Sequence, residues 1–208
     1  MNGSRWMVLF SPREKFPQVV ASQPLVVTLV FASIWGMSRN LSEVLDRGMA
    51  NAGIHWHDAA PDGVAAFVLV QLLAGIPTGI GIIWGCAWIL RRSTRWMGGE
   101  ISDADMRTVF AWSCAPELFN VCLFLLLIVL YRSAILIEGV RGRPVTSLCF
   151  HLAAVVSGIW QITLFIKGIS TVGKLSTGRA ALAFIAGIAI CGVVIVLATF
   201  GWYWVASR

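Results

Sequence analysis

Five apolar segments, each long enough to cross a lipid bilayer, constrain the fold of this sequence more than any other feature. A transmembrane helix needs about 20 predominantly apolar residues, because the hydrocarbon core is about 30 Å thick. The segments that meet this length are residues 19–37, 63–90, 108–131, 147–169 and 180–205. Irregular backbone cannot face lipid, and the segments show no strand-like alternation, so they predict helices. We therefore expect an all-α polytopic membrane protein, a bundle of five transmembrane helices.

The composition is typical of a surface that faces lipid. Of the 208 residues, 58% are hydrophobic and 12% are charged, whereas soluble domains carry about 25% charged residues. The net charge of +6 does not indicate nucleic-acid binding, because the basic residues stand singly or in pairs at the ends of apolar segments, where they orient helices. We expect the lipid bilayer as a partner and no nucleic acid.

Basic residues are distributed unevenly between the two sides of the expected bundle. The N-terminus and the loops after the second and fourth segments carry more Lys and Arg than the other side. Because basic loops stay in the cytoplasm, this bias predicts a cytoplasmic N-terminus and a C-terminus on the opposite side. We expect residues 1–18 to form a cytoplasmic interfacial segment on an anionic surface, and residues 19–208 to form the five-helix transmembrane domain.

The third segment contains the most unusual residue for a membrane span, the acid Glu117. If the hydrocarbon begins where this segment begins, Glu117 lies about 14 Å deep. An acid at that depth costs a few kcal/mol unless it is protonated or paired. Pro116 precedes it and frees the carbonyl of Trp112, Asn120 follows one turn later, and Gln161 in the fourth segment has a similar depth. The three polar residues can form a candidate intramembrane site.

Two interpretations of this polar cluster remain open. The functional one is a proton or cation site, or a polar patch that contacts a substrate. The structural one is a set of hydrogen bonds that hold the third and fourth helices together. The variant Glu117→Gln separates the two interpretations, because a functional acid loses its activity in a protein that still assembles.

Glycines recur at helix-packing spacing in the second segment. Gly75 with Gly79, and Gly81 with Gly85, are GxxxG pairs, which allow helices to approach closely. Pro77 predicts a kink in this long segment. Broken helices line binding sites in transporters, but those folds usually show paired breaks in two halves. The pattern therefore favours helix packing over a binding site.

Short interfacial helices are expected between the spans. Asn40 and Glu43 form a start signal like a capping box in the first external loop, followed by an apolar helical face. In the loop after the second segment, a short helix is expected over residues 102–107. Ser102 and Asp105 have the spacing of a helix start signal there.

The sequence contains no recognisable catalytic or cofactor signature. No nucleophile, base and orienting residue form a set, and no cofactor motif is present. His55 and His57 in the first external loop offer two metal ligands, but no third ligand has a fixed spacing. The five cysteines lie inside apolar segments or at their edges, as small buried hydrophobes do. We expect a protein that is not an enzyme and that needs no metal or other cofactor.

Several local patterns follow one another in order along nearly the whole chain. Leu9-Phe-Ser-Pro-Arg-Glu-Lys-Phe16 stands near the start of the chain, and Pro24 stands near the start of the first segment. The loop after the second span carries Gly98-Gly99-Glu100, and the third span opens with Ala111-Trp-Ser-Cys-Ala-Pro116. The fourth span closes with Trp160-Gln-Ile-Thr-Leu-Phe-Ile-Lys-Gly-Ile169, and the fifth opens with Arg179-Ala180. Together these patterns resemble the Yip1 family of integral membrane proteins, small bacterial inner-membrane members above all.

The resemblance implies a five-helix transmembrane fold in the bacterial inner membrane, and it leaves the activity open. In that membrane, the C-terminus that the basic residues place opposite the cytoplasm is expected to be periplasmic. Eukaryotic relatives act in vesicle traffic and bind prenylated Rab GTPases. The sequence lacks their long cytosolic N-terminal region and their Asp-Leu-Tyr-Gly-Pro signature, so that role is not carried over.

Three functional hypotheses remain. The first is a non-enzymatic protein that organises the membrane or scaffolds a partner, either another membrane protein or a second copy of the chain. The second is a small transporter or lipid-handling protein that uses Glu117 and the break at Pro77. The third, a membrane-embedded hydrolase, lacks a suitably placed catalytic pair.

Overall fold

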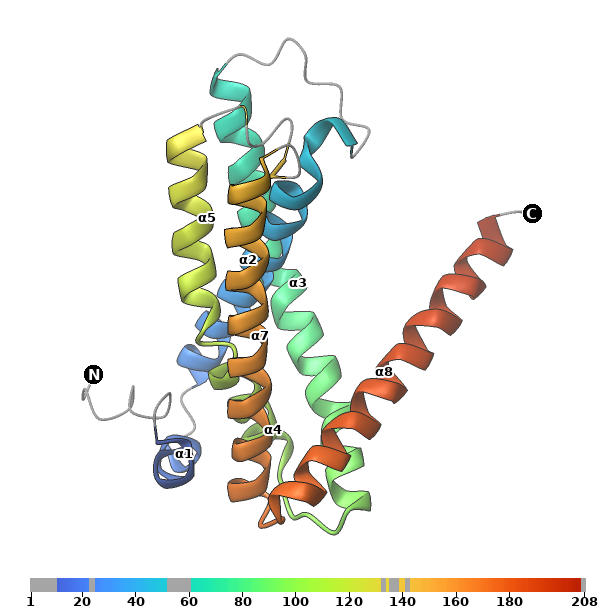
Figure 1. Cartoon of the computed structure of the whole chain (residues 1–208). Coiled ribbons are helices and arrows are strands. Elements are labelled where there is room, and N and C mark those ends of the chain that lie inside the picture. The colour runs from blue at the N-terminus through green and yellow to red at the C-terminus, as the bar shows by residue number, and fades with distance from the viewer. Residues whose placement is uncertain are drawn as a thin grey trace. The chain divides into compact units, whose positions relative to one another are not determined.

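The computed structural model describes residues 11–22, 25–51, 61–131, 134, 139–140 and 143–206. Every regular element among these residues is helical (Figure 1). The helices are α1 (Pro12–Ala21), α2 (Leu25–Asn51), α3 (Pro61–Trp96), α4 (Asp103–Ser113), α5 (Glu117–Tyr131), α7 (Pro144–Val172) and α8 (Thr177–Ala206). The all-α prediction is confirmed. His55 and His57, considered above as metal ligands, lie outside the described residues.

Four of the described helices are long and apolar enough to cross a membrane. They contain the spans Leu25–Asp46, Ala66–Trp96, Pro144–Val172 and Thr177–Val194. The bent pair α4 and α5 supplies a fifth crossing if the two helices act as one span. The polytopic membrane architecture expected from the hydropathy pattern is therefore confirmed.

The first span begins later and runs further than the sequence predicts. Residues 19–21 belong to α1, and α2 begins at Leu25 and continues to Asn51. The expected separate helix starting at Asn40 is wrong, because α2 passes through this position without interruption. The Asn40 side chain donates to the carbonyl of Gln71 at 3.1 Å. Leu41 and Leu45 are buried in an apolar cluster, so tertiary packing carries the helix past its local start signal.

The third span is divided where the sequence predicts one helix over residues 108–131. Ser102 does cap a helix, because its hydroxyl accepts the N–H of Asp105 at 3.1 Å. That helix does not end at residue 107 but continues as α4 to Ser113. Three turn residues, 114–116, then separate α4 from α5, and the two helices meet at 40°.

The turn between α4 and α5 replaces helical hydrogen bonds with tighter ones. The N–H of Ala115 donates to the carbonyl of Trp112 at 3.1 Å, and the N–H of Glu117 donates to Cys114 at 2.9 Å. We expected Pro116 to leave the carbonyl of Trp112 free. This carbonyl instead accepts the hydrogen bond from Ala115, three residues later. Such short-range bonds tighten a helix end where the regular ladder stops.

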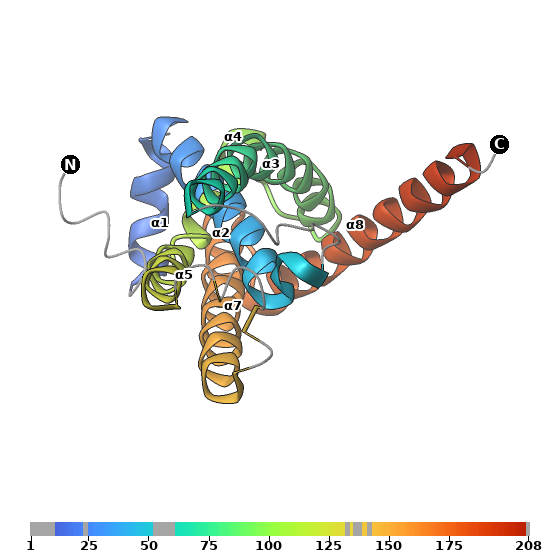
Figure 2. The same cartoon turned by 90° about the horizontal axis from the view of Figure 1, so that it is seen from above.

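The chain divides into two compact units, of which the second is Val26–Gly81 and Ala111–Ile162. In this unit α5 runs alongside the first part of α7, as both views show (Figures 1 and 2). Phe124 on α5 and Phe150 on α7 have ring centroids 5.2 Å apart. The core of the unit consists of the buried residues Leu41, Leu45, Phe67, Phe124, Leu127, Val140 and Phe150.

The first unit comprises Met1–Leu25, Ile82–Phe110 and Thr163–Arg208. Phe16 of α1 is fully buried in it, although we expected residues 1–18 to lie on a membrane surface. Its ring lies against Gly168 of α7, where an added Cβ would be 3.1 Å from the ring. The part of the predicted segment before residue 11 lies outside the described residues. Within the described part, Phe16 anchors α1 to the protein.

The end of α3 in the first unit is capped by the glycine pair Gly98 and Gly99. Gly98 has a φ of 85°, its N–H donates to Arg95, and the N–H of Gly99 donates to Thr94. This arrangement is a Schellman cap, which favours glycine at the left-handed position. The N–H of Glu100 then donates to the carbonyl of Gly173 at 3.3 Å, so the loop joins the end of α7.

Candidate functional site

Glu117 is the first residue of α5 and is held by side chains from three helices of the second unit. Its Oε2 accepts the hydroxyl of Ser38 on α2 at 2.5 Å and the amide of Asn120 at 2.9 Å. Its Oε1 accepts the amide of Gln161 on α7 at 2.5 Å. The side chain is buried, with 9% of its surface exposed. Both carboxyl oxygens are therefore engaged inside the protein.

Asn120 extends the network from α5 to a second position on α7. It lies one turn after Glu117, and its Oδ1 accepts the hydroxyl of Ser157 at 3.0 Å. Ser157 and Gln161 are four residues apart, so they lie on the same face of α7. The result is one continuous set of hydrogen bonds that joins α2, α5 and α7.

The break before α5 leaves no free amides for the carboxyl group of Glu117. The N–H groups of the first three residues of α5 donate to the carbonyls of the turn residues 114–116. The carboxyl group is therefore held by side chains, and their hydrogen bonds offset part of the cost of burying it.

The structure brings together the three polar residues that the sequence singled out, and it adds two others. Ser38 and Ser157 complete the network, and both are buried. Ser157 has a weak signal in the sequence, because it precedes Gln161 by one helical turn. Ser38 has none, because serines in membrane helices often bond to their own backbone, as Ser33 does with the carbonyl of Leu29.

A groove of about 240 Å³ runs between α5 and α7 beside this network. Its lining residues are Phe119, Asn120, Leu123, Ala153, Val156, Ser157 and Trp160. The rings of Phe119 and Trp160 stack with centroids 5.9 Å apart. The walls are apolar, and the hydrogen-bonded pair of Asn120 and Ser157 supplies the polar atoms. Such a groove suits an acyl chain or another apolar ligand with a single polar contact.

The two GxxxG pairs of α3 have different surroundings. A Cβ added at Gly75 would lie 2.6 Å from Met37, and one added at Gly79 would lie 2.8 Å from the backbone nitrogen of Gly36. This first pair therefore meets α2 within the second unit. Gly81 and Gly85 have no such neighbour among the described residues within 4 Å.

Two further predictions concern the helix break at Pro77 and the binding of metal ions. Pro77 lies inside α3, which the structure describes as one helix from Pro61 to Trp96. Among the residues that the structure describes, no three His, Cys, Asp or Glu side chains are grouped to hold a metal ion. The prediction that the protein needs no cofactor stays a prediction.

Comparison with known proteins identifies one family. The family model of the Yip1 domain matches residues 6–199, nearly the whole chain. No curated protein and no solved structure matches the sequence. The family match covers the polar network, the groove and the Gly98–Gly99 loop.

Proposed function

Because the chain belongs to the Yip1 family, we propose that it is a non-enzymatic membrane protein that organises the membrane or scaffolds a partner protein. The proposal includes a location in the bacterial inner membrane, with the N-terminus in the cytoplasm and the C-terminus in the periplasm. A reporter fused after Arg208 tests this orientation, because a periplasmic C-terminus predicts no cytoplasmic reporter activity.

The observation that carries the scaffolding proposal is the set of bonds around Glu117. The buried side chain of Glu117 accepts hydrogen bonds from Ser38, Asn120 and Gln161. Each such bond in a membrane contributes about 1 kcal/mol or less, and together they join three helices. An acid engaged on both oxygens supports a structural role more than a role in transport.

Outward-facing small residues on α3 support association with another helix. Gly81 and Gly85 are exposed, and small residues permit close packing between membrane helices. Ile82 and Trp88 on the same helix are also exposed, at 40% and 55%. The proposed partner is a second copy of the chain or another membrane protein.

Crosslinking in native membranes, followed by purification, tests the scaffolding proposal. We expect a reproducible crosslinked species in the wild type and its loss in Gly81→Ile/Gly85→Ile, which fills the open face of α3. Val193→Leu, at an exposed position on α8, is a control for a change in apolar bulk. A protein that neither self-associates nor crosslinks to a defined partner contradicts the proposal.

The groove beside α5 supports a second candidate function, the handling of a lipid. Its apolar walls and its Asn120–Ser157 pair suit an acyl chain with a nearby ester or hydroxyl group. Reconstitution into liposomes with a fluorescent phospholipid tests this candidate. We expect lipid movement between leaflets that Ala153→Phe blocks by filling the groove, and that the matched substitution Ala181→Phe on α8 leaves unchanged. Movement no faster than in empty liposomes contradicts it.

A further inference from the structure

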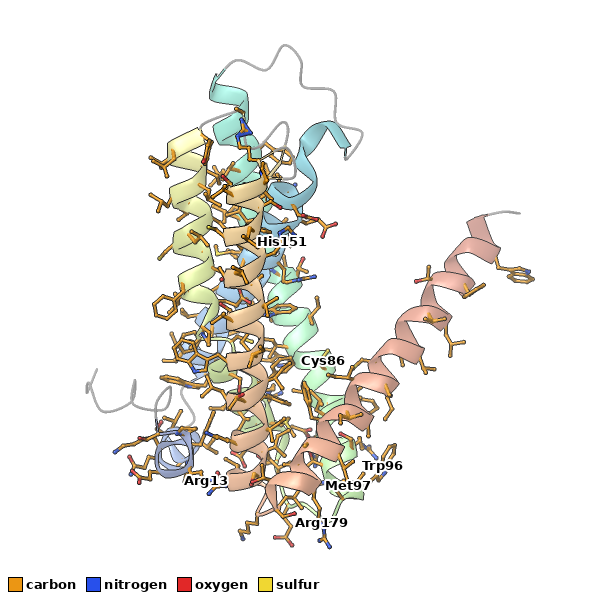
Figure 3. All side chains as sticks on the ribbon, in the orientation of Figure 1. Arg13, Cys86, Trp96, Met97, His151 and Arg179 are labelled. Carbon is orange, nitrogen blue, oxygen red and sulfur yellow. The ribbon has the colours of Figure 1, made fainter. Side chains whose placement is uncertain are left out.

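A second cavity, in the first unit, lies where the start of α1 meets the last turns of α7. It has a volume of about 210 Å³ and is lined by Ser11, Pro12, Arg13, Glu14 and Lys167. The Phe16 ring against Gly168, the residue after Lys167, holds α1 to this part of α7. Figure 3 shows Arg13 on α1 beside the end of α7. Two basic side chains that are 154 residues apart in sequence therefore line one cavity.

Neither cation is neutralised by a carboxylate among the described residues. A guanidinium nitrogen of Arg13 donates to the hydroxyl of Thr177 at 3.3 Å, which orients the side chain. Lys167 is partly buried on α7. Within the described part of the chain, no carboxylate lies within salt-bridge distance of Arg13 or Lys167. The charges are therefore available to an anion.

The backbone at the start of α1 has the same preference for an anion. Ser11 is the N-cap residue, but its side chain makes no capping hydrogen bond. Pro12 has no N–H, and the N–H groups of Arg13 and Glu14 belong to the first turn, whose amides have no partner within the helix. Uncapped amides and the positive end of the helix dipole favour negative charge.

We propose that this cavity binds a phosphate group, that of an anionic phospholipid headgroup. Arg is suited to phosphate because its planar fork donates two parallel hydrogen bonds, and Lys adds a point charge. Lys167 lies five residues before the end of α7, or about 7.5 Å along the helix. The cavity thus lies where an apolar span leaves the hydrocarbon and where lipid phosphates are concentrated.

The Glu14 carboxylate also lines the cavity and opposes the binding of an anion. The site therefore contains two positive charges and one negative charge. Substitution of a basic residue and substitution of the acid should change phosphate binding in opposite directions. Removal of a basic side chain must weaken phosphate binding, whereas removal of the Glu14 charge must strengthen it. A general attraction of a basic protein to anionic lipid does not predict this dependence on position.

Native mass spectrometry of the full chain in an uncharged detergent tests the proposal. The probes are phosphatidylglycerol and phosphatidylcholine with identical acyl chains, in equal amounts. We expect the wild type to retain phosphatidylglycerol preferentially. Lys167→Gln and Arg13→Gln each reduce that preference about five-fold, and Glu14→Gln increases it. The control variant Arg95→Gln/Lys174→Gln removes the same charge as Arg13→Gln/Lys167→Gln but lies outside the cavity, so it retains the preference.

A second experiment with inorganic phosphate distinguishes the phosphate of a lipid from that of a soluble ligand. Displacement of phosphatidylglycerol by millimolar phosphate supports recognition of the phosphate group itself at the lipid site. Phosphate binding that is lost in Arg13→Gln/Lys167→Gln, with no preference between the two lipids, supports a phosphate site but assigns it to a soluble ligand. Equal lipid preference in the cavity and control double variants, with no phosphate binding, overturns the proposal. Circular dichroism of each variant shows that it is folded.

Discussion

The hydroxyl of Ser38 on α2 donates a hydrogen bond to Oε2 of Glu117 on α5 at 2.5 Å, although 79 residues separate the two in the chain. The same carboxyl group accepts Gln161 from α7. A single acid at the start of a broken span therefore joins three helices. If the network is structural, its removal must be measurable as a loss of stability before any activity is known.

Replacement of Glu117 by Ala should destabilise the protein by roughly 1–3 kcal/mol. The change removes the acceptor of three hydrogen bonds and leaves the donors Ser38, Asn120 and Gln161 without it. Glu117→Gln keeps one acceptor oxygen and should cost less than half as much. Unfolding in detergent, followed by circular dichroism, measures both. An Ala variant as stable as the wild type would show that the network does not hold the helices together.

Replacement of Gly36 by Ala should disrupt the contact between α2 and α3. An added Cβ would overlap the carbonyl oxygen of Gly75 and lie 2.6 Å from the nitrogen of Gly79, and backbone cannot move aside as a side chain can. We expect a loss of about 1–3 kcal/mol in unfolding free energy. Gly81→Ala is the matched control, because a Cβ added there meets no described atom of another helix within 4 Å, and its effect should stay within about 0.5 kcal/mol. Similar effects of the two substitutions would contradict the close packing.

Oxidation should crosslink α3 to α8 in the first unit. The Sγ atoms of Cys86 and Cys191 are 3.9 Å apart, and Cys86 lies on the side of α3 towards α8 (Figure 3). A membrane-permeant oxidant removes two electrons and two protons from the pair, so the protein should lose two thiols that react with maleimide. Cys86→Ser should prevent the crosslink and Cys122→Ser should not. Reaction of all five thiols after oxidation would show that α8 does not pack there.

Replacement of Arg91 by Gln should loosen the loop between α3 and α4. Arg91 forms an ion pair with Asp103 at 2.6 Å and donates to the carbonyl of Ile101 at 3.3 Å, so it joins both ends of the loop. Asp103 is 45% exposed, and the expected loss is below about 1 kcal/mol. Limited proteolysis should therefore cut within residues 97–102 faster, whereas Arg92→Gln should leave the rate unchanged. Equal cutting in the two variants would contradict the role of Arg91.

Helix type and approximate span limits were predictable from the sequence, because hydrophobic length is a local property. The expected span over residues 147–169 lies within α7, and the expected span over 180–205 lies within α8. The start signal at Ser102 was also correct, since a cap involves residues only three positions apart. Local signals failed at Asn40, where Leu41 and Leu45 are buried in the core and the helix continues. Burial against a neighbouring helix outweighs a cap worth about 1 kcal/mol.

The candidate site was also predictable only in part from the sequence. Hydropathy marks Glu117 as unusual from its depth alone, since an acid in an apolar span has a cost that does not depend on its neighbours. The identity of the hydrogen-bond partners of Glu117, in contrast, depends on which helices pack beside it. Ser38 reaches Glu117 because α2 occupies its place against α3, where Gly36 meets Gly75 with no room for a side chain. That approach combines residues far apart in the chain, and such contacts exist only once the helices have packed.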